Sequence, residues 1–83
     1  MQDVQREEII TTVKDVISQE TEVPADKIEL DTRLVDLGID SLDVLKFALA
    51  FENLFKITIS TAEVLQIQTV GDIVTRLERK FAS

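Results

Sequence analysis

The sequence predicts an all-α fold, a small four-helix bundle of three main helices and one short helix. Three observations favour it. The 83 residues include only two glycines and one proline, so a single domain over residues 1–83 with one core is expected. Apolar residues recur at three- and four-residue spacings in three stretches, which is typical of amphipathic helices. A residue that commonly caps helices precedes each of the later stretches.

The first helix is predicted over residues 4–18 and is followed by a long connection. Its apolar positions are Val4, Ile9, Ile10, Val13, Val16 and Ile17. Residues 20–40 lose this spacing and contain Pro24 and Gly38. Apolar residues in the connection can pin it to the core: Val23, Ile28, Leu30, Leu34, Leu37 and Ile39. A loop this long in a small domain is usually functional or disordered, and the pins favour a functional loop.

The second helix, from its predicted cap Asp40 to about Phe55, has two apolar faces. At about 100° per residue, one broad sector holds the residues expected in the core: Val44, Phe47, Ala48, Phe51, Leu54 and Phe55. Leu42, Leu45 and Leu49 fall on the opposite side. One helix cannot bury both faces in so small a domain, so part of this second face is expected to be exposed. It is either a partner site or a set of scattered surface leucines, which are common.

Two further caps predict the remaining helices. The segment "STAEVLQ" offers Ser60 or Thr61 as the cap of a helix of one or two turns. Thr69 and Asp72 stand at the paired positions of a capping box, which predicts a last helix through about Lys80.

Composition argues against several classes of function. The chain has no cysteine and no histidine, which removes disulfides, thiolate chemistry, imidazole bases and the commonest zinc ligands. A net charge of −7 argues against nucleic acid as a partner. The polar start and the short run "FALAF" predict neither a signal peptide nor a membrane span. We therefore expect a cytoplasmic protein with no membrane partner. Arg33 and Val35 occupy positions where a calcium loop needs oxygen ligands, so no metal site is expected.

Ser41 lies between Asp40 and Leu42 at the predicted start of the second helix. It could belong to the helix cap, which is the commonest role of such a serine. A nucleophilic role lacks support because the chain has no histidine base and no G-x-S-x-G elbow. It could also be an attachment point, since a phosphodiester there would meet free backbone N–H groups and the positive end of the helix dipole. Position alone leaves the cap and the attachment point open.

The stretch "LGIDSLDVLKFALAFENLF" resembles the modification site of acyl carrier proteins. The resemblance spans essentially the whole chain, including the pattern "P..I..D..L.DLGIDSL" and the "I.TV.DI" entry to the last helix. It implies a non-catalytic carrier whose Ser41, with Gly38, Asp40 and Leu42 around it, holds 4′-phosphopantetheine transferred from coenzyme A by a phosphopantetheinyl transferase. The thiol of this group would hold acyl chains as thioesters. Candidates to line a cavity for the acyl chain are Val44, Phe47, Phe51, Ile59 and Ile67.

The resemblance also implies that the second helix docks partner enzymes of acyl-activating, condensing and acyltransferase type, in fatty-acid, lipid or polyketide-type biosynthesis. A monomer is expected. The candidate docking residues are Asp36, Asp40, Leu42, Asp43, Leu45, Lys46, Leu49, Glu52 and Lys56. Several positions that are acidic or polar in typical carriers of fatty-acid synthesis hold other residues here: Lys46, Asn53, Leu54, Lys56, Thr58 and Leu65.

The charge of the second helix favours a specialised carrier over a general one. Residues 20–43 hold eight acids against Lys27 and Arg33, whereas residues 44–60 carry a net charge of +1. Basic partner patches that are selective for an acidic helix should be repelled by Lys46 and Lys56. Two alternatives remain. One is an aminoacyl or peptidyl carrier, and the other is an unmodified interaction module of the same fold.

Overall fold

The computed structural model describes the backbone of residues 2–82 and the side chains of residues 6–80. The predicted apolar position Val4 and the side chain of Phe81 lie outside the described side chains. The α-helices are α1 (Gln2–Thr21), α2 (Ser41–Phe55), α3 (Thr61–Leu65) and α4 (Val70–Ala82), and residues 2–82 contain no β-strand. This confirms the predicted all-α bundle. No helix of these residues is long and apolar enough to cross a membrane.

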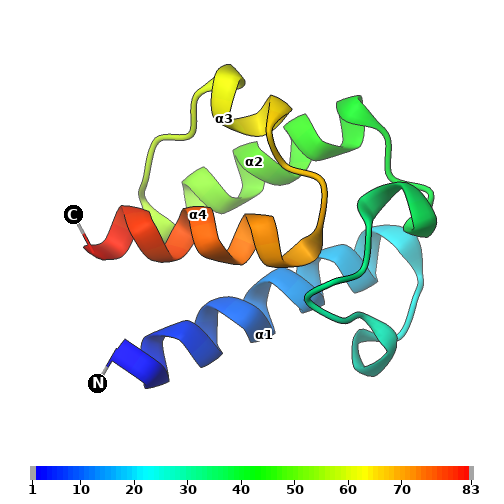
Figure 1. Ribbon diagram of the computed structural model, residues 1–83, viewed down its shortest axis with the longest axis horizontal. Coiled ribbons are helices and arrows are strands. Elements are labelled where there is room, and N and C mark those ends of the chain that lie inside the picture. The colour runs from blue at the N-terminus through cyan, green and yellow to red at the C-terminus, as the bar shows by residue number, and fades with distance from the viewer. Residues whose placement is uncertain (1, 83) are drawn as a thin grey trace.

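The helices form two neighbouring pairs. α1 packs on α4, and α2 packs on α3. In Figure 1, α2 and α4 run in the same direction and α1 runs in the opposite one, so both termini lie at one end of the molecule. The connection between α1 and α2, the start of α2 and the loop between α3 and α4 gather at the other end (Figure 1).

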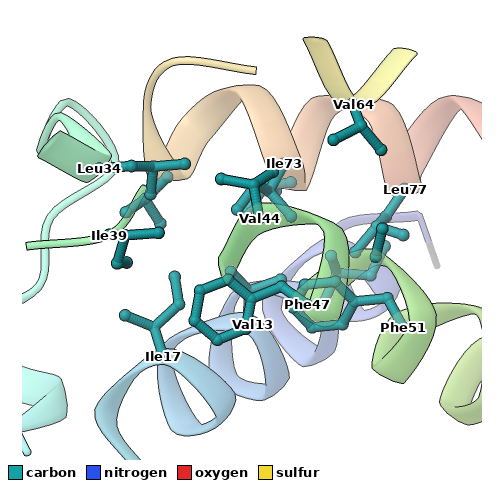
Figure 2. Close-up of a cluster of buried hydrophobic side chains, with 14 of the residues drawn as sticks. Val13, Ile17, Leu34, Ile39, Val44, Phe47, Phe51, Val64, Ile73 and Leu77 are labelled. Atoms are coloured by element: carbon teal, nitrogen blue, oxygen red, sulfur yellow. The ribbon is translucent and has the colours of Figure 1, made fainter. Parts of the chain in front are cut away.

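The core takes side chains from all four helices and from the connection. Figure 2 shows Val13 and Ile17 of α1 near Phe47 and Phe51 of α2, with Ile73 and Leu77 of α4 and Val64 of α3 across from them. The sequence placed Leu54 on the same face, and this prediction was wrong. Residue Leu54 is 57% exposed, whereas Phe51 is 1% exposed. Leu54 lies only about 20° around the helix from Phe47, which is 4% exposed, so its exposure depends on which parts of the chain reach the end of α2.

The connection is more regular than the sequence predicted. It contains two short 3-10 helices, η1 (Ala25–Lys27) and η2 (Leu34–Leu37). Of its predicted apolar pins, Ile28, Leu34 and Ile39 are buried. α1 also extends beyond residue 18, to Thr21. It ends there because Glu22 adopts the left-handed conformation (φ 62°), and the Glu22 N–H donates to the Ser18 carbonyl at 2.8 Å. Glycine usually fills this position, so a glutamate there does not indicate the end of a helix.

The connection is joined to the start of α4 by backbone hydrogen bonds. The Leu34 N–H donates to the Gln68 carbonyl (2.9 Å), and the Gly71 N–H donates to the Leu30 carbonyl (2.7 Å). Glycine is favoured at residue 71, because a Cβ atom there would lie 2.9 Å from the Leu30 carbonyl oxygen. The segment that precedes Ser41 is therefore fixed to the helical core.

α3 is held by its cap and by a basic side chain of α4. Of the two predicted cap residues, Ser60 or Thr61, it is Ser60 that caps α3. Its hydroxyl accepts from the Glu63 N–H (3.2 Å), and its N–H donates to the Glu63 carboxylate (2.8 Å). Lys80 of α4 forms an ion pair with Glu63 at 2.9 Å. The Ser60 N–H and Lys80 together lower the pKa of Glu63 from 4.5 to about 2.

The lowered pKa of Glu63 predicts a pH-dependent contribution to stability. A carboxylate whose pKa is lower in the folded chain than in the unfolded chain stabilises the fold at pH values above its ordinary pKa of 4.5. This contribution is lost as the pH falls towards about 2. We expect the melting temperature of the wild-type protein to exceed that of Glu63→Gln at neutral pH, and the difference to shrink between pH 4.5 and about 2. Lys80→Gln should lower the melting temperature at neutral pH by less than Glu63→Gln does, because the Ser60 N–H still donates to the Glu63 carboxylate. A difference that is constant down to pH 2 would contradict this account.

Candidate functional site

Ser41 is the first residue of α2, and its side chain is not needed for the helix cap. The Asp40 carboxylate accepts from the Asp43 N–H at 2.9 Å, and the Asp43 carboxylate accepts from the Asp40 N–H at 3.2 Å. This capping box confirms that the cap belongs to Asp40. Ser41 is exposed, and no described residue bonds its hydroxyl group. The hydroxyl is thus available for modification.

Gly38 sets the direction of the chain just before Ser41. Its φ of 77° is left-handed, and its N–H donates to the Leu34 and Val35 carbonyls. A Cβ at this position would meet no atom within 4 Å, so glycine is required here by conformation and not by space. The turn places Ile39 in the core, 4% exposed, two residues before the exposed serine.

A groove of about 500 Å³ opens beside Ser41. Its walls come from η2 and the residues around it, the first turn and a half of α2, and α3 with the loop that follows it. Leu34, Ile39 and Val64 form its buried part, and Val35, Leu45 and Leu65 line it as exposed side chains. The charged residues in its lining are Arg33 and Asp40. No imidazole or amine base faces Ser41 from this lining, so the groove does not activate the hydroxyl as a nucleophile.

The five predicted cavity residues surround a common seam in the core. Val44, Phe47, Phe51, Ile59 and Ile67 all line it, together with residues of α4. Its open volume is about 10 Å³, which is near the minimum for one water molecule. Enlarging it to the ~150 Å³ that holds a benzene-sized guest would cost about 3–4 kcal/mol at ~24 cal/mol per Å³. The entry of an acyl chain into the seam therefore stays a prediction, and it requires the side chains that line the seam to move.

The outer face of α2 is apolar and exposed, as predicted. Leu42, Leu45 and Leu49 are 67%, 39% and 61% exposed. Lys46 is exposed on the same helix. Lys56 is also exposed and ends α2 in the left-handed conformation. At about 1.5 Å per residue, α2 separates Lys56 from Ser41 by roughly 22 Å.

The acidic docking candidates differ in their surroundings. Asp36 is exposed on η2, and Asp40 and Asp43 form the cap of α2. The carboxylate of Glu52 accepts from the Ile59 N–H at 2.8 Å and so holds the loop between α2 and α3. This structural role of Glu52 was not predicted. It removes one carboxylate from the freely exposed surface of α2.

Sequence reasoning did not identify Arg33 and Val35 as residues beside the site. A 3-10 helix has about three residues per turn, so Leu34 and Leu37 share one side of η2 and Val35 points elsewhere. Val35 is 64% exposed on the groove. The three-residue spacing of Leu34 and Leu37 is a signal of such a helix. In the sequence, both residues were interpreted only as apolar residues that hold a loop against the core.

Comparisons with known proteins agree with this site. A family model described as the phosphopantetheine attachment site matches residues 11–77. An acyl carrier protein of Thermotoga maritima is 40% identical over 77 residues, which cover 92% of this chain and 95% of the relative. One of Campylobacter hominis is 35% identical over 72 residues, which cover 86% and 91%.

The fold agrees with a solved structure as well. A crystal structure of an acyl carrier protein from Thermotoga maritima matches with a TM-score of 0.82 and 23% identity, covering 93% of this chain and 91% of that one. The exposed serine fits covalent attachment of the group that the family model describes. Since the family model and the relatives each cover most of the sequence, the chain belongs to the acyl carrier protein family and is a non-catalytic carrier of covalently attached 4′-phosphopantetheine.

Proposed function

We propose that Ser41 is the attachment point of 4′-phosphopantetheine and that the chain presents acyl groups to enzymes of fatty-acid, lipid or polyketide-type biosynthesis. The observation that carries this proposal is the exposed Ser41 hydroxyl, which the Asp40–Asp43 capping box leaves free at the start of α2. A phosphodiester there lies at the positive end of the 15-residue helix. When bound, the group supplies a thiol, which this cysteine-free chain lacks, and the thiol holds acyl groups as thioesters.

Intact-protein mass spectrometry tests this function. The purified chain is incubated with coenzyme A, Mg²⁺ and a phosphopantetheinyl transferase. We expect a mass gain equal to one phosphopantetheine group, and a second gain when an acyl-activating enzyme, ATP and a fatty acid are added, because the thiol displaces AMP from the acyl adenylate. Absence of the first gain with several transferases would contradict the proposal.

Partner enzymes are proposed to dock on the outer face of α2. The exposed leucines supply apolar contact next to Ser41, and Asp36 and Asp40 supply negative charge at the same end of the helix. Lys46 lies among the leucines. The Glu52 carboxylate accepts a hydrogen bond from the Ile59 N–H, so it contributes less negative charge to this face. We therefore propose that the face is mixed in charge and that the carrier serves a restricted set of enzymes.

Charge reversal on α2 tests this restricted role. We expect Lys46→Glu combined with Lys56→Glu to raise kcat/KM for an acyltransferase of general fatty-acid synthesis by about tenfold at low salt, because like-charge repulsion is removed. The gain should shrink at high salt. Lys14→Glu combined with Lys27→Glu makes the same charge change outside α2, on α1 and η1, and should have little effect. A wild-type chain as efficient as a general carrier, with no response to reversal, would contradict the restricted role.

The alternative of an aminoacyl or peptidyl carrier differs only in the enzyme that charges the thiol. It is supported if an amino-acid-activating enzyme loads the holo-protein and acyl-activating enzymes do not. The specific partners, the acyl group and a cytoplasmic location stay predictions.

A further inference from the structure

Arg33 is a cation beside Ser41 to which the proposed function gives no role. We propose that its guanidinium group binds the phosphodiester that joins phosphopantetheine to Ser41, so that Arg33 is a positioning residue for the attached end of the group. The inference rests on the proposed function, because it requires phosphopantetheine on Ser41. It assigns a role to a residue that stands eight positions before the attachment point.

The chain around Ser41 is acidic, which opposes a bound phosphate. Asp36, Asp40 and Asp43 all lie within five positions of the serine. The capping box holds the carboxylates of Asp40 and Asp43 at the start of α2. A phosphodiester adds a further negative charge at the same place. The helix dipole offsets part of the resulting repulsion, and a cation close to the phosphate would offset more of it.

Arg33 is the cation that the fold places in the groove with Ser41. Both residues line this groove, and the other charged residue of its lining is Asp40. The side chain of Arg33 is exposed. Within the described side chains, its guanidinium group takes part in no ion pair or hydrogen bond. The guanidinium group is therefore available to an anion at Ser41.

The backbone of Arg33 is fixed, whereas its side chain is exposed. Arg33 pairs with Thr69 in an isolated antiparallel bridge, and the N–H of the next residue, Leu34, donates to the Gln68 carbonyl at 2.9 Å. The Arg33 carbonyl accepts from the Asp36 N–H at 3.0 Å. Leu34 is buried in the core at 3% exposure. These contacts hold the base of the Arg33 side chain at one place on the wall of the groove.

The chemistry of arginine suits a phosphodiester. The guanidinium group is always charged, and its planar fork of N–H donors can bond two oxygens of one phosphate. A phosphodiester offers two oxygens that carry no ester bond. Because the contact is exposed to solvent, salt should weaken it. We expect it to restrict the attached end of phosphopantetheine and to leave the thiol end free to reach enzymes.

NMR of the arginine side chains detects the contact directly. The chain contains four arginines, Arg6, Arg33, Arg76 and Arg79, and each gives one Nε–Hε signal after labelling with ¹⁵N. Spectra are recorded before and after loading from coenzyme A by a phosphopantetheinyl transferase. We expect the Arg33 signal to shift several-fold more than the other three. The shift should shrink when NaCl is raised from about 50 mM to about 500 mM.

³¹P NMR of loaded variants tests the contact from the phosphate. Arg33→Gln should shift the phosphodiester signal and narrow its line, because the attached end of phosphopantetheine becomes more mobile. Arg33→Lys keeps the charge without the fork and should fall between the wild type and Arg33→Gln. Lys27→Gln is the control. It removes one positive charge from η1 in the same connection, outside the groove, and should leave the phosphorus signal unchanged.

The outcomes separate this inference from the proposed function. The intact mass of each NMR sample reports loading. A wild-type chain that does not load overturns both the proposed function and the role of Arg33. A loaded chain whose Arg33 signal shifts no more than those of the other arginines overturns the role of Arg33 alone. The same conclusion follows if the ³¹P signals of Arg33→Gln and the wild type are identical.

Discussion

Ser41→Ala is expected to abolish loading with phosphopantetheine completely while the fold is preserved. The hydroxyl is the only part of the side chain that is lost, and the cap of α2 depends on Asp40 and Asp43. Alanine is also a good helix former at this position. Intact-protein mass spectrometry with coenzyme A and a transferase measures the loading, and thermal unfolding followed by circular dichroism measures the fold.

Ser60→Ala is the matched control, because Ser60 precedes α3 and caps it. Loss of the hydrogen bond from the Glu63 N–H should lower the free energy of unfolding by about 1 kcal/mol, and loading should remain complete. The two variants should therefore have opposite effects: Ser41→Ala loses loading but keeps its stability, and Ser60→Ala keeps its loading but loses stability. Loading of Ser41→Ala at the wild-type level would show that another residue carries the group.

Phe51→Ala is expected to lower the free energy of unfolding by about 3–5 kcal/mol. The residue is 1% exposed, lines the seam, and its ring lies 6.3 Å from that of Phe55. The total stability of a chain of 83 residues is about 4–12 kcal/mol. The variant should therefore lose a large part of its stability, which urea unfolding followed at 222 nm measures.

Leu54→Ala on the same helix is the control for Phe51→Ala. The exposed leucine should change the free energy of unfolding by less than about 0.5 kcal/mol. Equal losses for the two variants would mean that α2 is rotated relative to the structure described above.

The sequence predicted most elements correctly because their signals are local. The caps at Asp40, Ser60 and Thr69 depend on a side chain and a backbone group three residues apart, and the structure shows all three. Helical spacing also separated Leu42 and Leu49 from the core face. Leu54 was the exception, since its exposure depends on which surfaces reach the end of α2 and not on the spacing within α2.

Features that join distant segments could not be predicted from spacing. The hydrogen bond from Gly71 to Leu30 links residues 41 positions apart. The groove exists only because η2 and α3 both lie beside the start of α2. Its rim residue Val35 belongs to a segment that the sequence marked as a loop. Glu52 was predicted only as a docking residue. Its hydrogen bond from the Ile59 N–H could not be predicted, because it depends on the course of the loop after α2.

Peptide mass spectrometry of the loaded protein tests the attachment of phosphopantetheine to Ser41 most directly. Trypsin cleaves after Arg33 and Lys46, and the peptide from Leu34 to Lys46 contains Ser41 as its single hydroxyl residue. We predict that this peptide carries the whole mass of phosphopantetheine and that fragment ions place it on Ser41. The same mass on any other peptide, with this peptide unmodified, would contradict the account.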